Sequence, residues 1–357
     1  MLKKVRIKNF LSCEDTEIEF DNVTALIGRN AAGKTNILKT IQAVASFILG
    51  NRLFYKEDLL RAEISLDFLF EENICSYSLS LSENVEIKEV FLCNNEVITE
   101  RVGEHAIYLK KEFQINELTS IVESILSLFP KNEINLSLKF FADCCKTVRY
   151  YILDINLKEE LENIPLFEYK KWFSNKRYFV THSVTMRLLY LWKEDKELFN
   201  ELQELLGRNG LGLIEKINIG EFQSFYLIRF CVKNGEVGYS ELSFGTQRVL
   251  IILLALLYDK STTLLIEQPE DGIHLGLLRK VLSICFTYAE AYNKQLIIST
   301  HSPKVINMFP AKSIRFVKMT EQGTKVTQLS EKELAIIPEY LNNEGTLSDF
   351  IEAMDDE

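Results

Sequence analysis

Hydrophobic and polar residues along this chain alternate at two different periods, and each change of period marks a different kind of segment. Near the N-terminus, Val5–Phe10 and Thr16–Phe20 alternate as short strands do, and Asn22–Ile27 is a β-branched, apolar run suited to a buried strand. From Ile37 to Ile48, apolar residues recur at helical spacing. The first 50 residues therefore predict strands, a loop after Ile27, and a helix.

A strand-like period of two returns between residues 61 and 100. Apolar residues recur at every second position in Ile64–Phe70 and in Tyr77–Leu81, and Asn, Glu and Ser turns separate the runs, which predicts an antiparallel meander. Residues 111–215 have a mainly helical pattern with little Gly or Pro. No heptad pattern persists there over several repeats, so we expect no long coiled-coil arm.

The C-terminal third predicts an α/β arrangement. Residues 222–232 alternate as a strand, and Val249–Tyr258 is apolar all round, as a buried helix is. Thr263–Ile266 and Gln295–Ser299 are short apolar runs of the kind found in parallel sheets. We predict one α/β domain with a helical insertion, divided into residues 1–110, 111–221 and 222–357.

Composition narrows the class of protein. The 357 residues are 47% hydrophobic and include seven cysteines and four histidines, without a C-x-x-C pair. An odd number of scattered cysteines indicates reduced thiols, and we interpret Cys144–Cys145 as packing residues and not as a redox pair. No apolar run approaches the roughly 20 residues that span a bilayer, and the N-terminus lacks an apolar signal core, so we expect a cytoplasmic protein.

The net charge of −10 opposes broad nucleic-acid binding, because proteins that coat DNA are usually basic. Small basic groups occur at Lys3–Lys8 and at Lys170–Arg177, and we interpret both as ordinary solvated faces. A local DNA site remains open as an alternative, without support from the global charge.

Residues Gly28–Thr35 read Gly-Arg-Asn-Ala-Ala-Gly-Lys-Thr and complete the G-x-x-x-x-G-K-T pattern of a phosphate-binding loop. The glycines let successive backbone N–H groups point at an anion, and the following helix directs its positive end there. Lys34 is expected to reach the β- and γ-phosphates of ATP, and Thr35 to bind Mg²⁺ through its hydroxyl. The expected nucleotide-binding residues of this segment are Asn30, Gly33, Lys34, Thr35 and Asn36.

Three later segments carry groups that a nucleotide site needs. Glu267 ends an apolar strand, where its carboxylate is placed to hold Mg²⁺. His301 ends another strand and is placed to bond the γ-phosphate. Ser243 and Gly245 open the all-apolar helix and form an anion-binding end. Taken singly, each has a structural alternative as a surface acid, a strand-end residue or a helix cap, but their order behind a complete loop favours the functional interpretation.

The motifs together resemble those of ABC-class ATPases of the RecF/SMC/OLD branch. The residues that carry the resemblance are Ser243-Phe-Gly-Thr246, Glu267-Gln-Pro-Glu270 and Ser299-Thr-His-Ser302. More narrowly, the chain is similar to single-chain AAA-type ATPases of bacterial anti-phage defence operons. The resemblance implies an ABC-type P-loop nucleotide-binding domain of α/β class with an antiparallel β subdomain and an inserted helical lobe.

The resemblance also implies a head-to-tail homodimer that closes around two ATP molecules. Lys34 and Thr35 of one subunit would bind ATP, and Ser243 and Gly245 of the other would cover its γ-phosphate. His274 falls near the implied interface, and a helix-cap role is an equal alternative for it.

Gln268 departs from the family, in which a glutamate at this position acts as general base. An amide positions water but does not accept its proton. Three interpretations follow: an engineered Glu-to-Gln trap, a natural Gln with Glu270 or Asp271 supplying the carboxylate, or an ATP-gated clamp with very slow hydrolysis. The expected catalytic residues are Gln268, Glu270 and His301.

The function we expect is an ATPase whose ATP-dependent dimer gates a separate nuclease or toxin-like effector. A DNA-binding repair ATPase of the RecF/SMC type and an ATP-dependent scaffold are the alternatives. A self-contained OLD-type nuclease is disfavoured, because the stretch after His301 leaves little room for a Toprim domain. The acidic segment Leu347–Glu357 could dock a partner, but we favour its interpretation as a solvated terminal helix.

Overall fold

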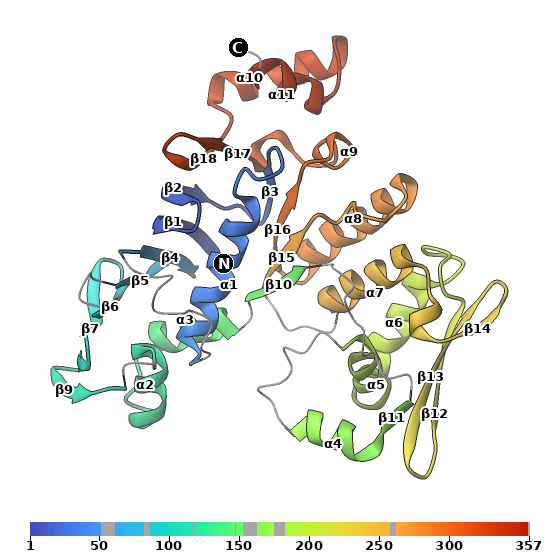
Figure 1. The fold of residues 1–357 in the computed structure, drawn as a ribbon, viewed down its shortest axis with the longest axis horizontal. Coiled ribbons are helices and arrows are strands. Elements are labelled where there is room, and N and C mark those ends of the chain that lie inside the picture. Colours follow the sequence, from blue (N-terminus) through green and yellow to red (C-terminus); the bar gives the residue numbers. More distant parts are fainter. Residues whose placement is uncertain are drawn as a thin grey trace. The chain divides into compact units, whose positions relative to one another are not determined.

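A computed structural model describes residues 1–50, 61–81, 86–116, 119–146, 148–152, 163–174, 183–257 and 262–355. The chain separates into two compact units (Figure 1). Unit 1 comprises Met1–Ile152, Ser261–Gln268 and Ala289–Glu357, and unit 2 comprises Leu153–Lys260 and Pro269–Tyr288. These limits differ from the divisions predicted after residues 110 and 221. Lys176, Arg177 and Tyr258 lie outside the described residues.

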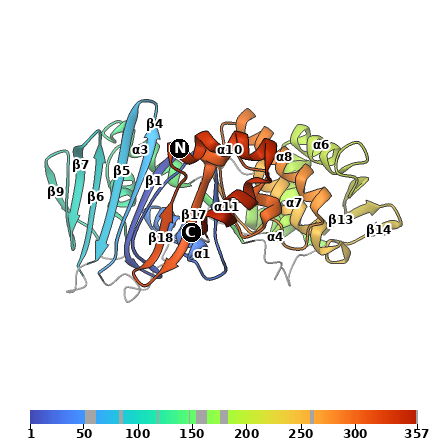
Figure 2. The ribbon, with the colours of Figure 1, turned by 90° about the horizontal axis from the view of Figure 1, so that it is seen from above.

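An antiparallel sheet forms one layer of unit 1, and its strands lie side by side in Figure 2. The eight strands follow the order β2-β1-β4-β5-β6-β7-β8-β9. Their bounds are β1 Leu2–Phe10, β2 Cys13–Glu19, β4 Glu63–Phe70, β5 Asn73–Leu81, β6 Ile87–Cys93, β7 Glu96–Val102, β8 His105–Tyr108 and β9 Lys111–Gln114. The meander predicted between residues 61 and 100 is confirmed, and it continues to Gln114.

A second sheet of unit 1 has the order β10-β15-β16-β3-β17-β18, and its first five strands are parallel. The bounds are β3 Val23–Ile27, β10 Val148–Ile152, β15 Thr263–Glu267, β16 Gln295–Thr300, β17 Ile314–Thr320 and β18 Gly323–Thr327. All side chains of β16 are buried, as expected for a parallel strand covered on both faces. The predicted strands at 263–266 and 295–299 are confirmed.

The helical pattern predicted for residues 111–215 is wrong at three places, where β9, β10 and β11 (Asn163–Pro165) are strands. Strand β10 is the most important of these, because it pairs in parallel with β15 and extends the central sheet. Its five residues, Val-Arg-Tyr-Tyr-Ile, are β-branched or aromatic except for one arginine. Five residues are too few to show a strand period within a longer segment whose pattern is mainly helical.

Helices from the N-terminal half of unit 1 pack against its two sheets. Helix α1 contacts β10 of the parallel sheet as well as α2 and α3, and α3 contacts β4 and β5 of the antiparallel sheet. Ile37, Ile41 and Val44 of α1 are fully buried, which confirms the predicted apolar spacing. The bounds are α1 Lys34–Ile48, α2 Ile121–Leu128, α3 Leu136–Lys146, α9 Pro303–Ile306, α10 Glu331–Asn343 and α11 Leu347–Asp355.

The cysteine pair on α3 packs in the core of unit 1. Neither Cys144 nor Cys145 forms a disulfide, and the two residues are 5% and 1% exposed. Burial raises the pKa of Cys144 to about 11, so the thiol stays protonated and unreactive at neutral pH. The interpretation of this pair as packing residues is confirmed.

Unit 2 combines helices with a small antiparallel sheet of β11, β13 (Phe225–Val232), β12 (Lys216–Glu221) and β14 (Gly235–Val237). Its helices are α4 Leu166–Ser174, α5 Val184–Glu194, α6 Lys196–Leu206, α7 Phe244–Leu257 and most of α8 (Leu275–Ala291). Helix α7 packs against α5 and α6, and its residues from Val249 to Leu257 are buried except Ile251. The buried helix predicted there is confirmed. Among the described residues, none of the helices has the length and apolarity needed to cross a bilayer.

Candidate nucleotide-binding site

The glycine-rich loop connects β3 of the parallel sheet to α1 in unit 1. Lys34 is only 6% exposed, because its Nζ donates hydrogen bonds to the carbonyl oxygens of Gly28 at 2.6 Å and Arg29 at 2.9 Å. The ammonium is thereby held inside the loop, next to the N-terminus of α1. A positive side chain and the helix dipole coincide at this point, which is the arrangement that binds phosphate groups.

The two loop glycines are required by the close approach of the β17–β18 hairpin. Gly33 has φ +106°, and a Cβ there would lie 2.1 Å from Oγ1 of Thr324. At Gly28, with φ +154°, a Cβ would lie 2.1 Å from the carbonyl oxygen of Val317. Neither position has room for a side chain, so the loop keeps its shape only with glycine.

Side chains distant in sequence hold the loop from outside. Oγ1 of Thr324 donates to the carbonyl of Ala32 at 3.1 Å and lies 2.7 Å from Oγ of Ser12, which accepts a 2.8 Å bond from Nδ2 of Asn36. Thr324 and Ala32 are 292 residues apart. The sequence analysis did not identify Ser12 and Thr324. Ser12 lies in the turn between β1 and β2 and Thr324 in the β17–β18 hairpin, and no local pattern links either of them to the loop.

We expect Thr324→Val to destabilise the protein by about 1–3 kcal/mol, because it removes the hydroxyl that satisfies Ala32 and Ser12. Urea unfolding of the wild type and the variant measures the change. Thr327→Val is the matched control, since Thr327 is exposed on the same strand and should cost less than about 0.5 kcal/mol. Equal effects of the two variants would contradict the proposed support of the loop.

Oxygen ligands for Mg²⁺ meet beside the loop. Oγ1 of Thr35 donates a hydrogen bond to Oε1 of Glu267, which ends β15. The carboxyl ends of β15, β16 and β3 lie at one edge of the parallel sheet, and this brings the two residues together. No cluster of three or more His, Cys, Asp or Glu occurs in the described part of the chain. The Thr35 hydroxyl and the Glu267 carboxylate fit Mg²⁺, which takes one or two protein oxygens together with phosphate and water ligands.

Gln268 and His301 lie side by side at the same edge. Nε2 of Gln268 is 3.2 Å from Nδ1 of His301, and the Gln268 backbone N–H donates to the carbonyl of Ser299 at 2.9 Å. Gln268 has φ +45°, an uncommon conformation for a residue other than glycine, and such conformations concentrate at functional sites. The amide donates to the imidazole when Nδ1 is unprotonated, so Gln268 orients His301 but supplies no basic group of its own.

The predicted signature residues lie in unit 2, at the N-terminus of α7. Ser243 is exposed, and its Oγ accepts a 3.3 Å hydrogen bond from the backbone N–H of Thr246. The helix-cap alternative for Ser243 is thus confirmed, and it leaves the hydroxyl at an exposed helix N-terminus. A Cβ on Gly245 would lie 2.7 Å from the carbonyl oxygen of Gly272, so this glycine permits a close backbone approach.

An arginine connects the signature helix to the segment after the strand β15. Nη1 of Arg248 donates to the carbonyl of Asp271 at 2.5 Å, and its guanidinium lies 4.8 Å from the ring centre of Phe244. Farther along, His274 is exposed, and its Nδ1 accepts a 3.3 Å bond from the N–H of Gly276 at the start of α8. This contact is the helix-cap alternative that the sequence allowed for His274.

The structure divides the expected site residues between the two units. Unit 1 contains Asn30, Gly33, Lys34, Thr35, Asn36, Glu267, Gln268 and His301. Unit 2 contains Ser243, Gly245 and Glu270. Within unit 1, the loop, the acid and the histidine converge as the sequence predicted.

The sequence of this chain is similar to that of an ATPase family and to those of individual known proteins. The profile of the AAA ATPase domain family matches residues 1–306. The chain is 22% identical to an ATP/GTP phosphatase of Helicobacter pylori, over 95% of both chains. It is 21% identical to the OLD nuclease of Thermus scotoductus, over 93% of this chain and 65% of the nuclease, so it spans somewhat less than two thirds of that protein.

Among solved structures, the fold is similar to the Smc head domain of Pyrococcus furiosus, which was solved with an extended coiled coil and bound to the C-terminal domain of ScpA. The TM-score is 0.58 at 12% identity, and the match covers 96% of this chain and 99% of that one. The likeness supports the predicted α/β fold of ABC-type nucleotide-binding domains with an antiparallel subdomain.

Proposed function

The chain belongs to the AAA ATPase domain family and is an ATP-binding ATPase of the SMC and OLD type. On this premise we propose that two copies close around ATP and thereby gate an effector protein. Lys34 and the loop amides hold the triphosphate, and Thr35 and Glu267 hold Mg²⁺. Mg²⁺ supplies charge neutralisation of the phosphates. Ser243 and Gly245 of the second copy complete the γ-phosphate site.

The observation that carries the proposal is the placement of the phosphate-binding groups. Unit 1 has a complete loop, an acid and a histidine, whereas Ser243 lies exposed at the N-terminus of a 14-residue helix in unit 2. An exposed helix start with a hydroxyl and a close-packed glycine is suited to bind an anion presented by another molecule. Because each copy has both halves, a two-fold dimer repeats the contact and buries two nucleotides.

The proposal is tested by static light scattering of the wild type with ATP and with ADP. We expect a dimer with Mg-ATP and a monomer with Mg-ADP, since only ATP presents a γ-phosphate to the second copy. An oligomer of the same size under both conditions would overturn the proposal.

We further propose that Gln268, which has no basic group, is not the general base, and that Glu270 supplies the carboxylate for hydrolysis. Glu270→Gln should then lower phosphate release by roughly 10²–10⁴-fold, which is what general-base catalysis typically contributes. On this proposal Gln268→Glu should change the rate little. Phosphate release by both variants at saturating Mg-ATP measures the effect.

The opposite result also has a defined meaning. If Gln268→Glu raises turnover strongly and Glu270→Gln has no effect, the protein is a slow clamp or a trapped form, and Glu270 is not the base. Glu339→Gln, on an exposed position of α10, is the control for loss of a carboxylate.

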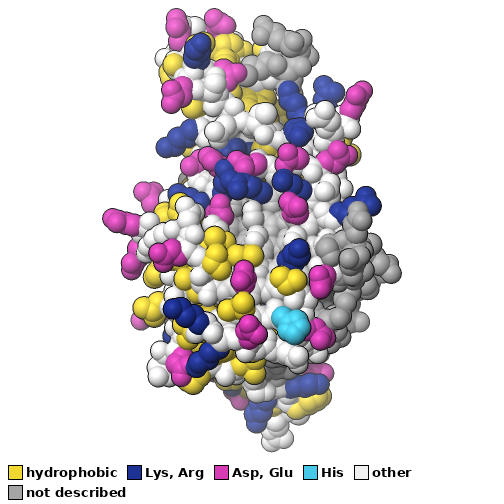
Figure 3. Space-filling model, turned by 90° about the vertical axis from the view of Figure 1, so that its left-hand side faces the viewer, with side chains coloured by type: hydrophobic (Ala, Val, Ile, Leu, Met, Phe, Trp, Pro, Cys, Tyr) yellow, Lys and Arg dark blue, Asp and Glu magenta, His cyan; other side chains and the backbone are white. Residues whose placement is uncertain are grey.

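Surface charge favours a protein effector over DNA. Lys4 and Arg6 of the N-terminal basic group are paired with Glu17, and Lys8 lies 3.5 Å from Glu63. Figure 3 shows the face over the β6–β9 end of the large sheet, where acidic and basic side chains are interspersed among the described residues. Together with the resemblance to ATPases of anti-phage defence operons, this leads us to infer that the effector is a separate nuclease or toxin-like protein. A recombination gene beside this one would favour the repair alternative instead.

A further inference from the structure

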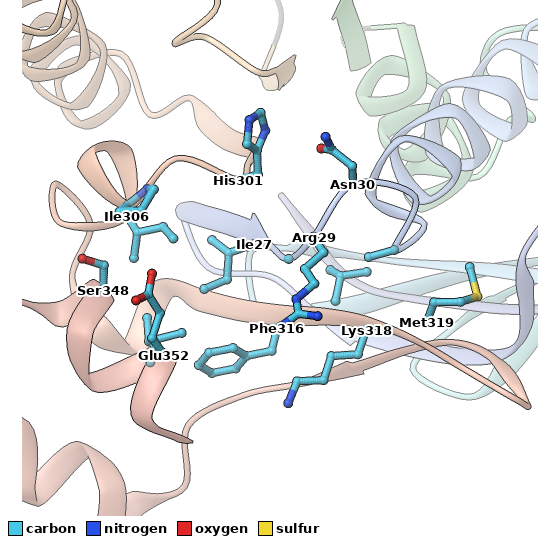
Figure 4. A pocket seen from close by; sticks show the side chains of 15 residues that line it. Ile27, Arg29, Asn30, His301, Ile306, Phe316, Lys318, Met319, Ser348 and Glu352 are labelled. Atoms are coloured by element: carbon cyan, nitrogen blue, oxygen red, sulfur yellow. The ribbon is translucent and has the colours of Figure 1, made fainter. Parts of the chain in front are cut away.

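A pocket of about 820 Å³ opens beside the phosphate-binding loop in unit 1. Figure 4 shows Asn30 and His301 at one rim, so the pocket borders the place where the γ-phosphate is expected. Its far walls come from β17 and from α11, which is attached to α9 by hydrogen bonds between Asn307 and Ser348 at 2.8 and 3.0 Å. The C-terminal helix, which we expected to be solvated, thus forms part of a pocket at the nucleotide site.

The pocket has a cationic part and an apolar part. Arg29 and Lys318 extend into it on one side, and Phe316 lies between them and Glu352 (Figure 4). Arg29 makes no side-chain hydrogen bond or ion pair with any residue that the structure describes. Ile306 and Ile351 join Phe316 in the apolar part. The pocket therefore suits a segment with an acid at the Arg29 side and an apolar side chain next to it.

The signature segment has this chemistry. Phe244 directly follows Ser243 and is 47% exposed, although Arg248 stacks against its ring. Glu241 comes three residues before Phe244 in the sequence, and its side chain is 61% exposed. A separation of three residues spans at most roughly 10 Å, which a pocket of this volume accommodates. Within its own unit, Oε2 of Glu241 accepts a 2.6 Å hydrogen bond from the backbone N–H of Gly238 and lies 3.8 Å from Nη1 of Arg229. Both contacts are made by the same carboxylate oxygen, and the ion pair is long and exposed.

We propose that this pocket is the receptor for the signature segment of a second copy, with Phe244 of that copy against Phe316 and Glu241 against Arg29. The inference rests on the proposed ATP-dependent dimer and names the contacts that make it selective for another copy of this chain. Ser243 lies between Glu241 and Phe244 in the sequence. When those two residues bind in the pocket, the Ser243 hydroxyl comes to the rim formed by Asn30 and His301. These charged and apolar contacts would then favour another copy of this chain over other proteins as the partner that covers the γ-phosphate.

The test exploits the two-fold repeat of the contact. Arg29→Glu and Glu241→Arg should each weaken ATP-dependent dimerisation by about tenfold, because each creates two like-charge contacts per dimer. An equimolar mixture of the two variants should restore dimerisation. In the mixed dimer, one contact joins the two substituted side chains, which have opposite charges, and the other joins the native Arg29 to the native Glu241. Analytical ultracentrifugation at saturating Mg-ATP, with the ATP affinity of each variant measured separately, gives the result.

Restoration on mixing requires that the two positions meet across subunits, because a contact within one chain would leave both variants mismatched. Lys131→Glu, an exposed charge reversal away from the pocket, is the matched control and should leave dimerisation unchanged. If the wild type dimerises with ATP and the charge variants dimerise equally well, or if mixing restores nothing, the receptor role is wrong and the proposed function stands. If the wild type forms no ATP-dependent dimer, both proposals fail.

Discussion

We expect Lys34→Ala to lower the affinity for Mg-ATP by roughly 10–150-fold, which corresponds to the about 1.5–3 kcal/mol of a charged hydrogen bond. Lys34 is almost fully buried, and its ammonium is held within the loop by the carbonyls of Gly28 and Arg29. Removing it leaves backbone amides and the dipole of α1 to hold a polyanion. Isothermal titration calorimetry with Mg-ATP measures the loss.

The same substitution also removes two hydrogen bonds within the loop, so it could lower the stability of the protein. Circular dichroism of the variant shows whether it is folded, and thus whether the lost affinity is a loss of binding. Lys39→Ala is the matched control, because Lys39 is exposed on the same helix and should bind ATP as the wild type does. Wild-type affinity in Lys34→Ala would mean that this loop is not the nucleotide site.

The nucleotide half-site could be predicted from the sequence because its parts are local. The strand, the loop and the helix around Gly33 follow one another along the chain, and Glu267 and His301 each end a short apolar run that predicts a parallel strand. Once those strands are parallel neighbours, their ends converge without further information. The fold class followed from the same order of elements.

What the sequence did not predict depends on contacts between distant segments. Strand β10 joins the central sheet by pairing with β15, and nothing in its own five residues specifies that neighbour. The bond from Thr324 to Ala32 and the pocket wall formed by Ile351 likewise come from the C-terminal part of the chain. Such contacts are set by tertiary packing, which local periodicity does not encode.

The positions of Ser243 and Gln268 were predicted, but their local conformations were not. Ser243 caps α7, which is the structural alternative that the sequence allowed, and the residue is exposed; its contact with phosphate stays a prediction. Gln268 adopts a left-handed backbone, and its amide faces His301. A positive φ at a non-glycine residue is imposed by the surrounding strand ends, so no propensity could have indicated it.

The largest expected effect concerns Ser243→Arg, which should abolish ATP-dependent dimerisation. The substitution places a bulky cation at an exposed helix N-terminus where a second copy's γ-phosphate and His301 must approach. It also removes the hydrogen bond to the Thr246 N–H, at a cost of about 1 kcal/mol that a protein of this size tolerates. We expect the variant to stay folded and monomeric with Mg-ATP, as light scattering would show.

Two controls identify the cause of that loss. Ser243→Thr keeps both the cap and the hydroxyl, so it should dimerise at ATP concentrations close to those of the wild type. Ser283→Arg adds the same cation to an exposed position of α8 in unit 2 and should have no effect. A Ser243→Arg protein that still dimerises with ATP would show that the start of α7 is a helix cap alone. The γ-phosphate would then be covered by other residues, and the dimer would close through another surface.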